Sequence, residues 1–259
     1  MSTQKNKETV IKPVEKIKEV THKAARAGTA TAPVRRYRAV VFLVVLLIIT
    51  TSFAVLTFLV KTTSSFPLDL QITIGIQSIN IPGFGGLMTT VSWPGFWPQS
   101  GIITALIILL ILGFGLQWEA LVALIAALLS IGLNVLVKDL IQRPRPAAVL
   151  VHALATLTDY SFPSGHVMFY TGFYGFIMFL AFTLLKPSLK RTLLLVLFGL
   201  LVLLIGVSRI FMGEHWASDV VGAYLLGTLM LVAIIQLYRW GKPRFFVHQL
   251  VAKAGSSVA

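Results

Sequence analysis

Cysteine is absent from this sequence, which excludes a disulfide framework and a thiolate metal site. Acidic residues are scarce and scattered, with nine Asp and Glu against 22 Lys and Arg. Charge of either sign is missing from several runs of 16 to 22 residues. As helices rising about 1.5 Å per residue, such runs can cross the hydrocarbon core of a bilayer, about 30 Å thick. These absences exclude an ordinary soluble domain and indicate a membrane protein.

Apolar residues make up 56% of the chain and lie in blocks, with no helical or strand period. The blocks predict an all-α fold, a six-transmembrane helical bundle. Its spans are Ala39–Val60, Gly101–Trp118, the segment from a short turn at Glu119 to Val137, Gly165–Leu185, Thr192–Val207 and Val220–Tyr238. The first run follows a 38-residue polar tail and is longer than the apolar core of a cleaved signal, so we expect it to be retained.

The distribution of charge predicts the orientation of the bundle. Residues 1–38 contain ten Lys and Arg and three Glu, a net charge of 10 − 3 = +7, whereas the loop Thr62–Ser100 contains neither Lys nor Arg. Further basic residues lie between spans four and five and after span six: Lys186, Lys190, Arg191, Arg239, Lys242 and Arg244. Because positive charge favours the cytoplasmic side, both termini are predicted to be cytoplasmic and the loop external.

Three regions follow from this reading. Residues 1–38 form a basic cytoplasmic tail expected to be disordered, residues 39–240 the six-span domain, and residues 241–259 a short basic C-terminal tail. The N-terminal tail either determines topology or attracts anionic lipid. The external loop is expected to contain two short helices, Leu68–Asn80 and Gly85–Trp93; whether it caps a site or only connects spans stays open.

One group of cations does not follow the charge pattern: Lys138, Arg143, Arg145 and Arg209 fall on the outer side, near span ends. Basic side chains beside hydrocarbon are costly unless an anion compensates them, and a phosphate group is such an anion. Pro144 disfavours helix at Arg143, so Lys138 falls on the last helical turn and Arg145 on an extended segment. The two can converge on one anion, although an ordinary basic helix end is the alternative.

A second polar cluster, Ser161-Phe-Pro-Ser-Gly-His166, opens the fourth span. Ser164 is a candidate N-cap, Gly165 allows close backbone approach, and the first amides of the helix can bind an anion. His166 lies in the first turn, from where it can donate a proton to a leaving oxygen. A plain helix cap at Ser164 and an interfacial histidine at His166 are the alternatives.

A third polar cluster runs from Ser208 to Asp219, between spans five and six. His215 and Asp219 are four residues apart, so on a helix their side chains would meet on one face. A carboxylate that holds one imidazole nitrogen leaves the other free to attack, which makes His215 a candidate nucleophile. A structural His–Asp pair is the alternative.

Together the clusters contain the patterns Lys138-x6-Arg145-Pro, Pro-Ser-Gly-His166 and Ser208-Arg-x5-His215-x3-Asp219. They resemble, in this order and at every signature position, the three motifs of the type 2 phosphatidic acid phosphatase superfamily. The resemblance covers about Leu56 to Tyr238 and implies the fold core that this superfamily shares with haloperoxidases.

The resemblance also implies a role for each motif residue. The phosphate-binding residues would be Lys138, Arg145, Ser164, Gly165 and Arg209. His215 would attack phosphorus and form a phosphohistidine, while His166 would protonate the departing alkoxide and then activate water. Asp219 would orient His215. Ser208 and Arg143 are assigned as supporting residues, and His152 matches no signature position. No metal or other cofactor is implied.

The implied activity is metal-independent hydrolysis of a lipid phosphate at the extracytoplasmic face of the plasma membrane. The implied partners are the lipid substrate and the bilayer, without nucleic acid. Undecaprenyl diphosphate, phosphatidate and phosphatidylglycerol phosphate all fit, so the substrate and the oligomeric state stay open. The alternatives are a lipid phosphotransferase, a vanadium haloperoxidase (a soluble class that six spans argue against) and a non-catalytic protein that binds anionic lipid.

Overall fold

The computed structural model of the chain describes residues 32–63, 65–155 and 157–244. The N-terminal tail predicted over residues 1–38 lies outside this part except for its last residues, and so does most of the C-terminal tail predicted over 241–259. The chain divides into two units after Ile48. Only the first half of one helix is described in the first unit, and everything discussed below lies in the second.

The described residues form helices and connections, with no strand among them. The elements are α2 (Ala32–Thr62), α3 (Pro67–Gln77), α4 (Phe84–Ser92), the 3-10 turn η1 (Trp93–Gly95), α5 (Gln99–Gly113), α6 (Gln117–Ile141), α7 (Gly165–Phe169), the π-helical turn η2 (Tyr170–Tyr174), α8 (Gly175–Leu184), α9 (Leu189–Phe211) and α10 (Ala217–Lys242). The all-α prediction is confirmed, and α3 and α4 confirm the two short helices predicted in the external loop.

Five helical segments in the described chain are long and apolar enough to cross a membrane, and α7, η2 and α8 count as one of them. A sixth span exists if the bent pair Phe84–Gly95 and Gln99–Gly113, with 62° between its parts, is counted as one. The 15 residues of α5 rise only about 22 Å, so they fall short of the hydrocarbon thickness alone. The predicted end of this span at Trp118 is wrong, because Gly115 (φ 74°) turns the chain just after Gly113.

Two further boundaries correct the sequence-based predictions. Helix α9 continues to Phe211, so Ser208 and Arg209 lie on its last turns and not in a connection. Helix α10 begins only at Ala217, with Trp216 as its N-cap, so His215 precedes it. The inference that His215 and Asp219 share a helix face is therefore wrong. The turn that separates the helices contains Gly213, whose φ of 69° favours glycine.

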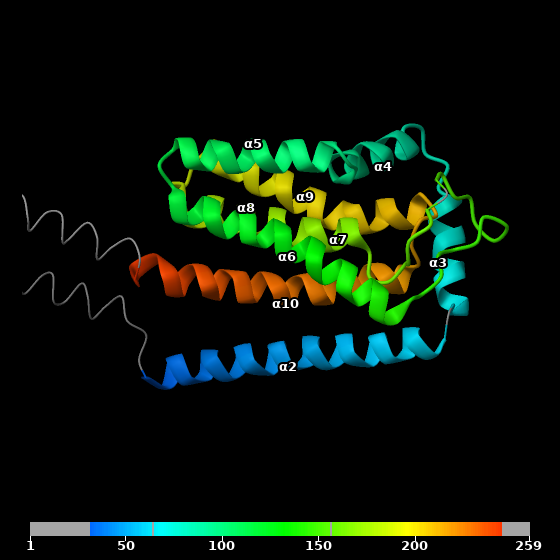
Figure 1. Cartoon of the computed structure of the whole chain (residues 1–259), viewed down its shortest axis with the longest axis horizontal. Helices are drawn as coiled ribbons and strands as arrows, with labels where there is room; N and C mark the ends of the chain where they lie inside the picture. The colour runs from blue at the N-terminus through cyan, green and yellow to red at the C-terminus, as the bar shows by residue number, and fades with distance from the viewer. Residues whose placement is uncertain (1–31, 64, 156, 245–259) are drawn as a thin grey trace, which may run out of the picture. The chain divides into compact units, whose positions relative to one another are not determined.

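The elements that carry the polar clusters meet at one end of the bundle. Figure 1 shows α5, α6, α8, α9 and α10 side by side, with α3 running across the end where α6 and α9 finish and α10 begins. We call this the α3 end. Gln77 of α3 donates hydrogen bonds to the carbonyls of His152 (2.7 Å) and Phe211 (2.9 Å) and so fastens α3 over this end. The connections α5–α6 and α8–α9 lie at the opposite end (Figure 1).

The segment α7–η2–α8 is the centre of the packed core. Its aromatic side chains Tyr170, Phe173 and Phe176 are fully buried. Small residues let neighbouring helices approach it, as is usual where apolar burial alone cannot drive helix association in lipid. Thus Gly227 of α10 packs against Thr171, and Gly222 packs against Phe162 just before α7. This packing fixes the start of α7 relative to α10.

We predict that Gly222→Ala destabilises the protein. The new Cβ would lie 2.3 Å from Cε2 of the buried Phe162 ring, and overpacking of this kind costs about 1–3 kcal/mol. Gly132→Ala on α6 is the matched control, because no atom lies within 4 Å of its added Cβ and helix propensity favours alanine. Thermal unfolding in detergent measures both. Equal midpoints for the two variants would contradict the packing described.

Candidate active site

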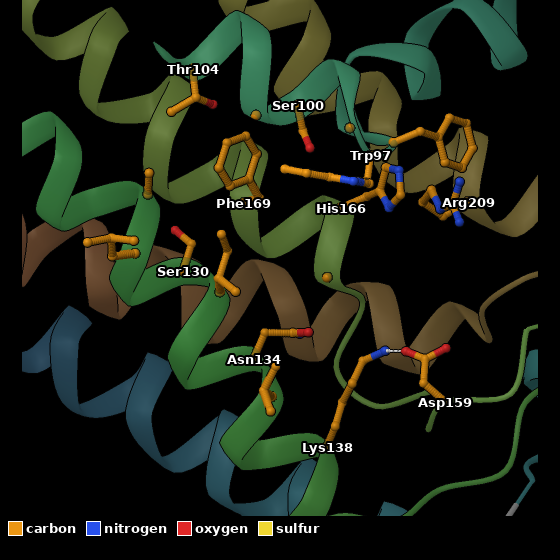
Figure 2. Close-up of a pocket in the computed structure, with 18 of the residues that line it drawn as sticks. Trp97, Ser100, Thr104, Ser130, Asn134, Lys138, Asp159, His166, Phe169 and Arg209 are labelled. Carbon is orange, nitrogen blue, oxygen red and sulfur yellow. Dashed lines mark hydrogen bonds and ion pairs between the residues drawn. The ribbon is translucent and has the colours of Figure 1, made fainter. Parts of the chain in front are cut away.

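A cavity of about 550 Å³ opens between α5, α6 and the start of α7 (Figure 2). The α3 end of the cavity is polar and is lined by Lys138, Arg145, Asp159, His166, Arg209, Glu214 and His215. The remainder is mostly apolar and is lined by residues that include Ala105, Ile108, Leu124, Leu128, Ile131 and Val135. The structure thus brings all three predicted clusters to one cavity that combines cations and histidines with an apolar groove.

The first two cations share one carboxylate, which the sequence reasoning missed. Lys138, on the last turns of α6, forms an ion pair with Asp159, visible as the dashed line in Figure 2. Arg145 donates from Nη2 to Oδ1 of Asp159 (2.7 Å) and from Nε to its backbone carbonyl (3.0 Å). Partial burial raises the pKa of Asp159, but the hydrogen bond and charge of Lys138, with Arg145, hold that pKa below its usual value. Asp159 is therefore ionised at neutral pH.

Arg145 also reaches the candidate nucleophile. Its Nη1 donates to the backbone carbonyl of Glu214 (2.6 Å) and lies 3.2 Å from Nε2 of His215. Lys138 and Arg145 converge on one anion in this structure, namely the Asp159 carboxylate. An anion that accepts from Arg145 would therefore stand directly in front of the His215 ring.

Arg209 is buried at the end of α9 and forms an ion pair with Glu214. Its Nη1 donates to the hydroxyl of Ser92 (3.3 Å), and its guanidinium stacks over the Phe96 ring at 5.3 Å. Ser208 points away from the cavity: its hydroxyl is hydrogen-bonded to that of Ser92 (2.6 Å) and donates to the carbonyl of Met88 (2.6 Å). Ser208 thus supports Arg209 indirectly, by joining α9 to α4.

His215 and Asp219 are neighbours, although the helix geometry that predicted this is wrong. His215 Nδ1 lies 3.6 Å from Oδ2 of Asp219, beyond hydrogen-bond length. The carboxylate is held by three donors: Arg143 Nη1 (2.5 Å), the hydroxyl of Ser161, and the amide of Trp216 (2.9 Å). Because Nδ1 faces Asp219, Nε2 is the nitrogen that faces the cavity.

Arg143, assigned from sequence only as a supporting residue, is the centre of a buried network. It pairs with Asp219 and, through Nη2, with Asp69 of α3 (2.8 Å). Asp69 in turn accepts from the amide (2.8 Å) and the hydroxyl (2.6 Å) of Ser218. The sequence reasoning missed Asp69, although a signal exists: it is the one charged residue between Thr62 and Ser100. An isolated charge beside apolar spans points to a partner.

His166 lies at the start of α7, against the loop between α2 and α5. The Phe96 ring packs edge-on against its imidazole, with 4.9 Å between centroids. Gly95 lies so close that an added Cβ would be 2.2 Å from Cδ2 of His166. Within the described part of the chain, Nε2 of His166 has no hydrogen-bond partner. The loop between α2 and α5, which carries Gly95 and Phe96, therefore covers this end of the cavity.

Ser164 and Gly165 lie where the second cluster predicts, with one correction. Ser164 is the N-cap residue of α7 by position, but its side chain makes no capping hydrogen bond, and its buried hydroxyl has no partner in the residues described. Gly165 lines the cavity. Asn134, one turn before Lys138 on α6, donates to the carbonyl of Pro163 (2.9 Å) and fixes this turn. The sequence reasoning missed Asn134.

His152 does not belong to the cavity. Its backbone amide and carbonyl bind the side chain of Gln77, at 3.0 and 2.7 Å, and its own side chain is exposed. Across residues 32–244, apart from the two gaps, no three His, Asp or Glu side chains are grouped so that they could hold a metal ion.

The electrostatics of the site favour neutral His215. Burial lowers its pKa well below the usual value, and the positive charges of Arg145 and Arg209 lower it further. A neutral imidazole keeps the lone pair that nucleophilic attack requires. The cations that would bind an anion therefore also keep the candidate nucleophile unprotonated.

Comparisons with known proteins identify the family of this chain. Residues 119–243 match the family described as the PAP2 superfamily. The chain is 30% identical over 189 residues to phosphatidylglycerophosphatase B of Bacillus subtilis, which covers 70% of this chain and 89% of the relative. It is 36% identical over 86 residues to an undecaprenyl-diphosphatase of Sulfolobus acidocaldarius, covering 32% of this chain and 36% of that protein.

A solved structure shares the fold. The crystal structure of the first transmembrane PAP2 type phosphatidylglycerolphosphate phosphatase from Bacillus subtilis aligns with a TM-score of 0.66 and 24% identity. The alignment covers 77% of this chain and 98% of that structure. The α-helical architecture described above is therefore the fold of a transmembrane protein with a known crystal structure.

We predict that His215 titrates below the ordinary histidine pKa of about 6.5. Because its pKa is lowered, the imidazole stays neutral as the pH falls through 6.5 and protonates only at lower pH. Nitrogen-15 NMR of labelled histidine in detergent, assigned with His215→Gln, gives the midpoint. Removing one of the charges with Arg145→Met should move that midpoint upward. A midpoint at or above 6.5 in the unmodified protein would contradict the described burial.

Proposed function

We propose that this chain cleaves a terminal phosphate from a lipid through a phosphohistidine on His215. The chain belongs to the PAP2 superfamily and is an integral membrane lipid phosphatase, and the proposal starts from these two facts. The observation that carries the proposal is the position of Arg145 Nη1, which lies 3.2 Å from Nε2 of His215. A phosphate bound by this guanidinium would place its phosphorus before the nucleophile. No step of the proposal uses a metal ion.

The residues around the cavity supply what phosphoryl transfer needs, namely charge on the equatorial oxygens, a nucleophile and an acid. The phosphate would be bound by Lys138, Arg145, Arg209, the Ser164 hydroxyl and the Gly165 amide. The unpartnered Ser164 hydroxyl supports its place in this set. Arg209 is held in position by its hydrogen bond to the Ser92 hydroxyl and by its contact with the Phe96 ring.

The reaction is proposed in two steps. Nε2 of His215 forms a bond to phosphorus while the bond to the lipid oxygen breaks, and His166 gives a proton to that oxygen. Asp219 stabilises the Nδ1–H proton as the ring becomes positive. His166 then takes a proton from water, the water oxygen bonds to phosphorus, and the P–N bond breaks to release inorganic phosphate and neutral His215.

The shape of the cavity supports an amphiphilic substrate. Its polar part lies at the α3 end, where spans finish, and its apolar part follows α5 and α6 from Asn134 to Leu124. Ten residues of helix correspond to about 15 Å, enough for much of an acyl or prenyl chain. A lipid would thus keep its chains in the groove and the bilayer while its phosphate reaches His215.

Among the lipid phosphates that fit, we propose phosphatidylglycerophosphate first and undecaprenyl diphosphate second. The relative named for the former aligns over most of its length, whereas the one named for the latter aligns over about a third. The proposed location is the extracytoplasmic face of the plasma membrane, with both termini cytoplasmic. The loop between α2 and α5 lacks Lys and Arg and caps the site, which supports this orientation.

The central experiment measures phosphate release by purified protein from phosphatidylglycerophosphate, undecaprenyl diphosphate and phosphatidate. His215→Ala and Arg209→Ala should each lower turnover at least about 10³-fold, since a nucleophile or a charge on the transferred group is lost. His152→Ala is the matched control, because this exposed histidine lies outside the cavity. Acid-labile radiolabel from a phosphate-labelled lipid should attach to the unmodified protein but not to His215→Ala. Turnover retained by folded His215→Ala would refute the proposal.

A separate prediction tests His166 as the general acid. His166→Ala should slow cleavage of lipid phosphates strongly and of nitrophenyl phosphate much less, because nitrophenolate leaves without a proton. Single-turnover rate constants for cleavage of the two substrates give the comparison. Equal slowing for both would show that His166 has another task.

A further inference from the structure

The phosphate-binding cations are not free in the described structure. Lys138 and Arg145 share Asp159, and Arg209 is paired with Glu214. A phosphate that enters must therefore exchange with a carboxylate that already occupies the same donors. The two carboxylates differ in how easily they can move away from the cations, because the Asp159 side chain is 55% exposed to solvent whereas the Glu214 side chain is 1% exposed.

The position of Asp159 allows it to move aside. It lies on the connection between α6 and α7, with water on one side of its carboxylate, so leaving the cations exposes it to solvent at little cost. Lys138 and Arg145, at 10% and 12% exposed, stay in the wall of the cavity. A charged carboxylate costs much less free energy where water solvates it than where it is buried in the protein interior without its partner.

Arg145 does not need the carboxylate to keep its place. Its Nε donates to the backbone carbonyl of Asp159 (3.0 Å), and its Nη1 donates to the backbone carbonyl of Glu214 (2.6 Å). Only Nη2 depends on the Asp159 side chain. Substitution of that side chain therefore removes a competing anion and leaves two backbone contacts that hold the guanidinium.

We propose that Asp159 is an internal competitor for the substrate phosphate, occupying Lys138 and Arg145 until phosphate displaces it and returning to them when the product leaves. The inference rests on the proposed function, because it requires that these two cations bind phosphate. Asp159 thereby sets the affinity of the site. It weakens the binding of both substrate and inorganic phosphate and assists release of the product. A site with three cations, if unopposed, would retain the phosphate it produces.

The test compares inhibition by inorganic phosphate in the unmodified protein, Asp159→Asn and Asp139→Asn. Asp139→Asn is the matched control, because Asp139 is an exposed acid next to Lys138 on α6 and its substitution removes the same charge. In Asp159→Asn the inhibition constant for phosphate should fall roughly two- to fivefold, the factor expected for one partly exposed ion pair. The KM should fall with it and kcat should not rise, while Asp139→Asn should leave all three constants unchanged.

The outcomes separate the two proposals. If the unmodified protein neither releases nor is inhibited by phosphate, the proposed function fails. If it does both and Asp159→Asn shows an equal or higher inhibition constant, Asp159 positions the cations and is not a competitor, so the inference is overturned. Asp159→Ala is measured beside it and should shift the constant in the same direction, and a thermal midpoint in detergent verifies that each variant is folded.

Discussion

Burial of positive charge at the edge of a membrane requires compensation, and this requirement organises the α3 end. Every buried or half-buried cation there is matched by a carboxylate. The pairs are Arg143 with Asp69 and Asp219, Arg209 with Glu214, and Lys138 and Arg145 with Asp159. Removing one partner of a fully buried pair such as Arg143–Asp219 leaves an uncompensated charge, which costs about 3–5 kcal/mol. The pairs join α3, α6, α9 and α10 and thereby hold the site together.

The same network determines what His215 can do. Asp219 is fixed by Arg143, the Ser161 hydroxyl and the Trp216 amide, so it stays beside Nδ1 without relying on the imidazole. The histidine ring is held between this carboxylate and Arg145. Its buried, cationic surroundings keep it neutral. In the proposed mechanism, a bound phosphate dianion would favour the positive ring that attack would create.

The apolar half of the cavity links this chemistry to the membrane. Phe96 and Gly95, in the loop between α2 and α5, cover His166 and Arg209, while α5 and α6 leave a groove that continues away from the charges. His215, Arg209 and Glu214 are buried at this end, and charges interact more strongly in a buried environment than in water. In the proposed function an amphiphile would meet both requirements, since its phosphate would pair with the cations and its chain would lie in the groove.

The helical class, the approximate spans and the residues of the three motifs could be predicted from the sequence. Long uncharged runs have few alternatives to crossing a bilayer, and Lys138, His166 and His215 are conspicuous because they interrupt those runs. The sequence did not determine where α5 ends, where α10 begins, or that Asp69, Asn134 and Asp159 serve the site. Those facts depend on contacts between residues far apart in the chain, such as Asp69 with Ser218 and Arg143 with Asp219, and on a close approach of loop and helix at Gly95. Because folding brings these residues together from distant parts of the chain, their contacts can be found only in the folded protein.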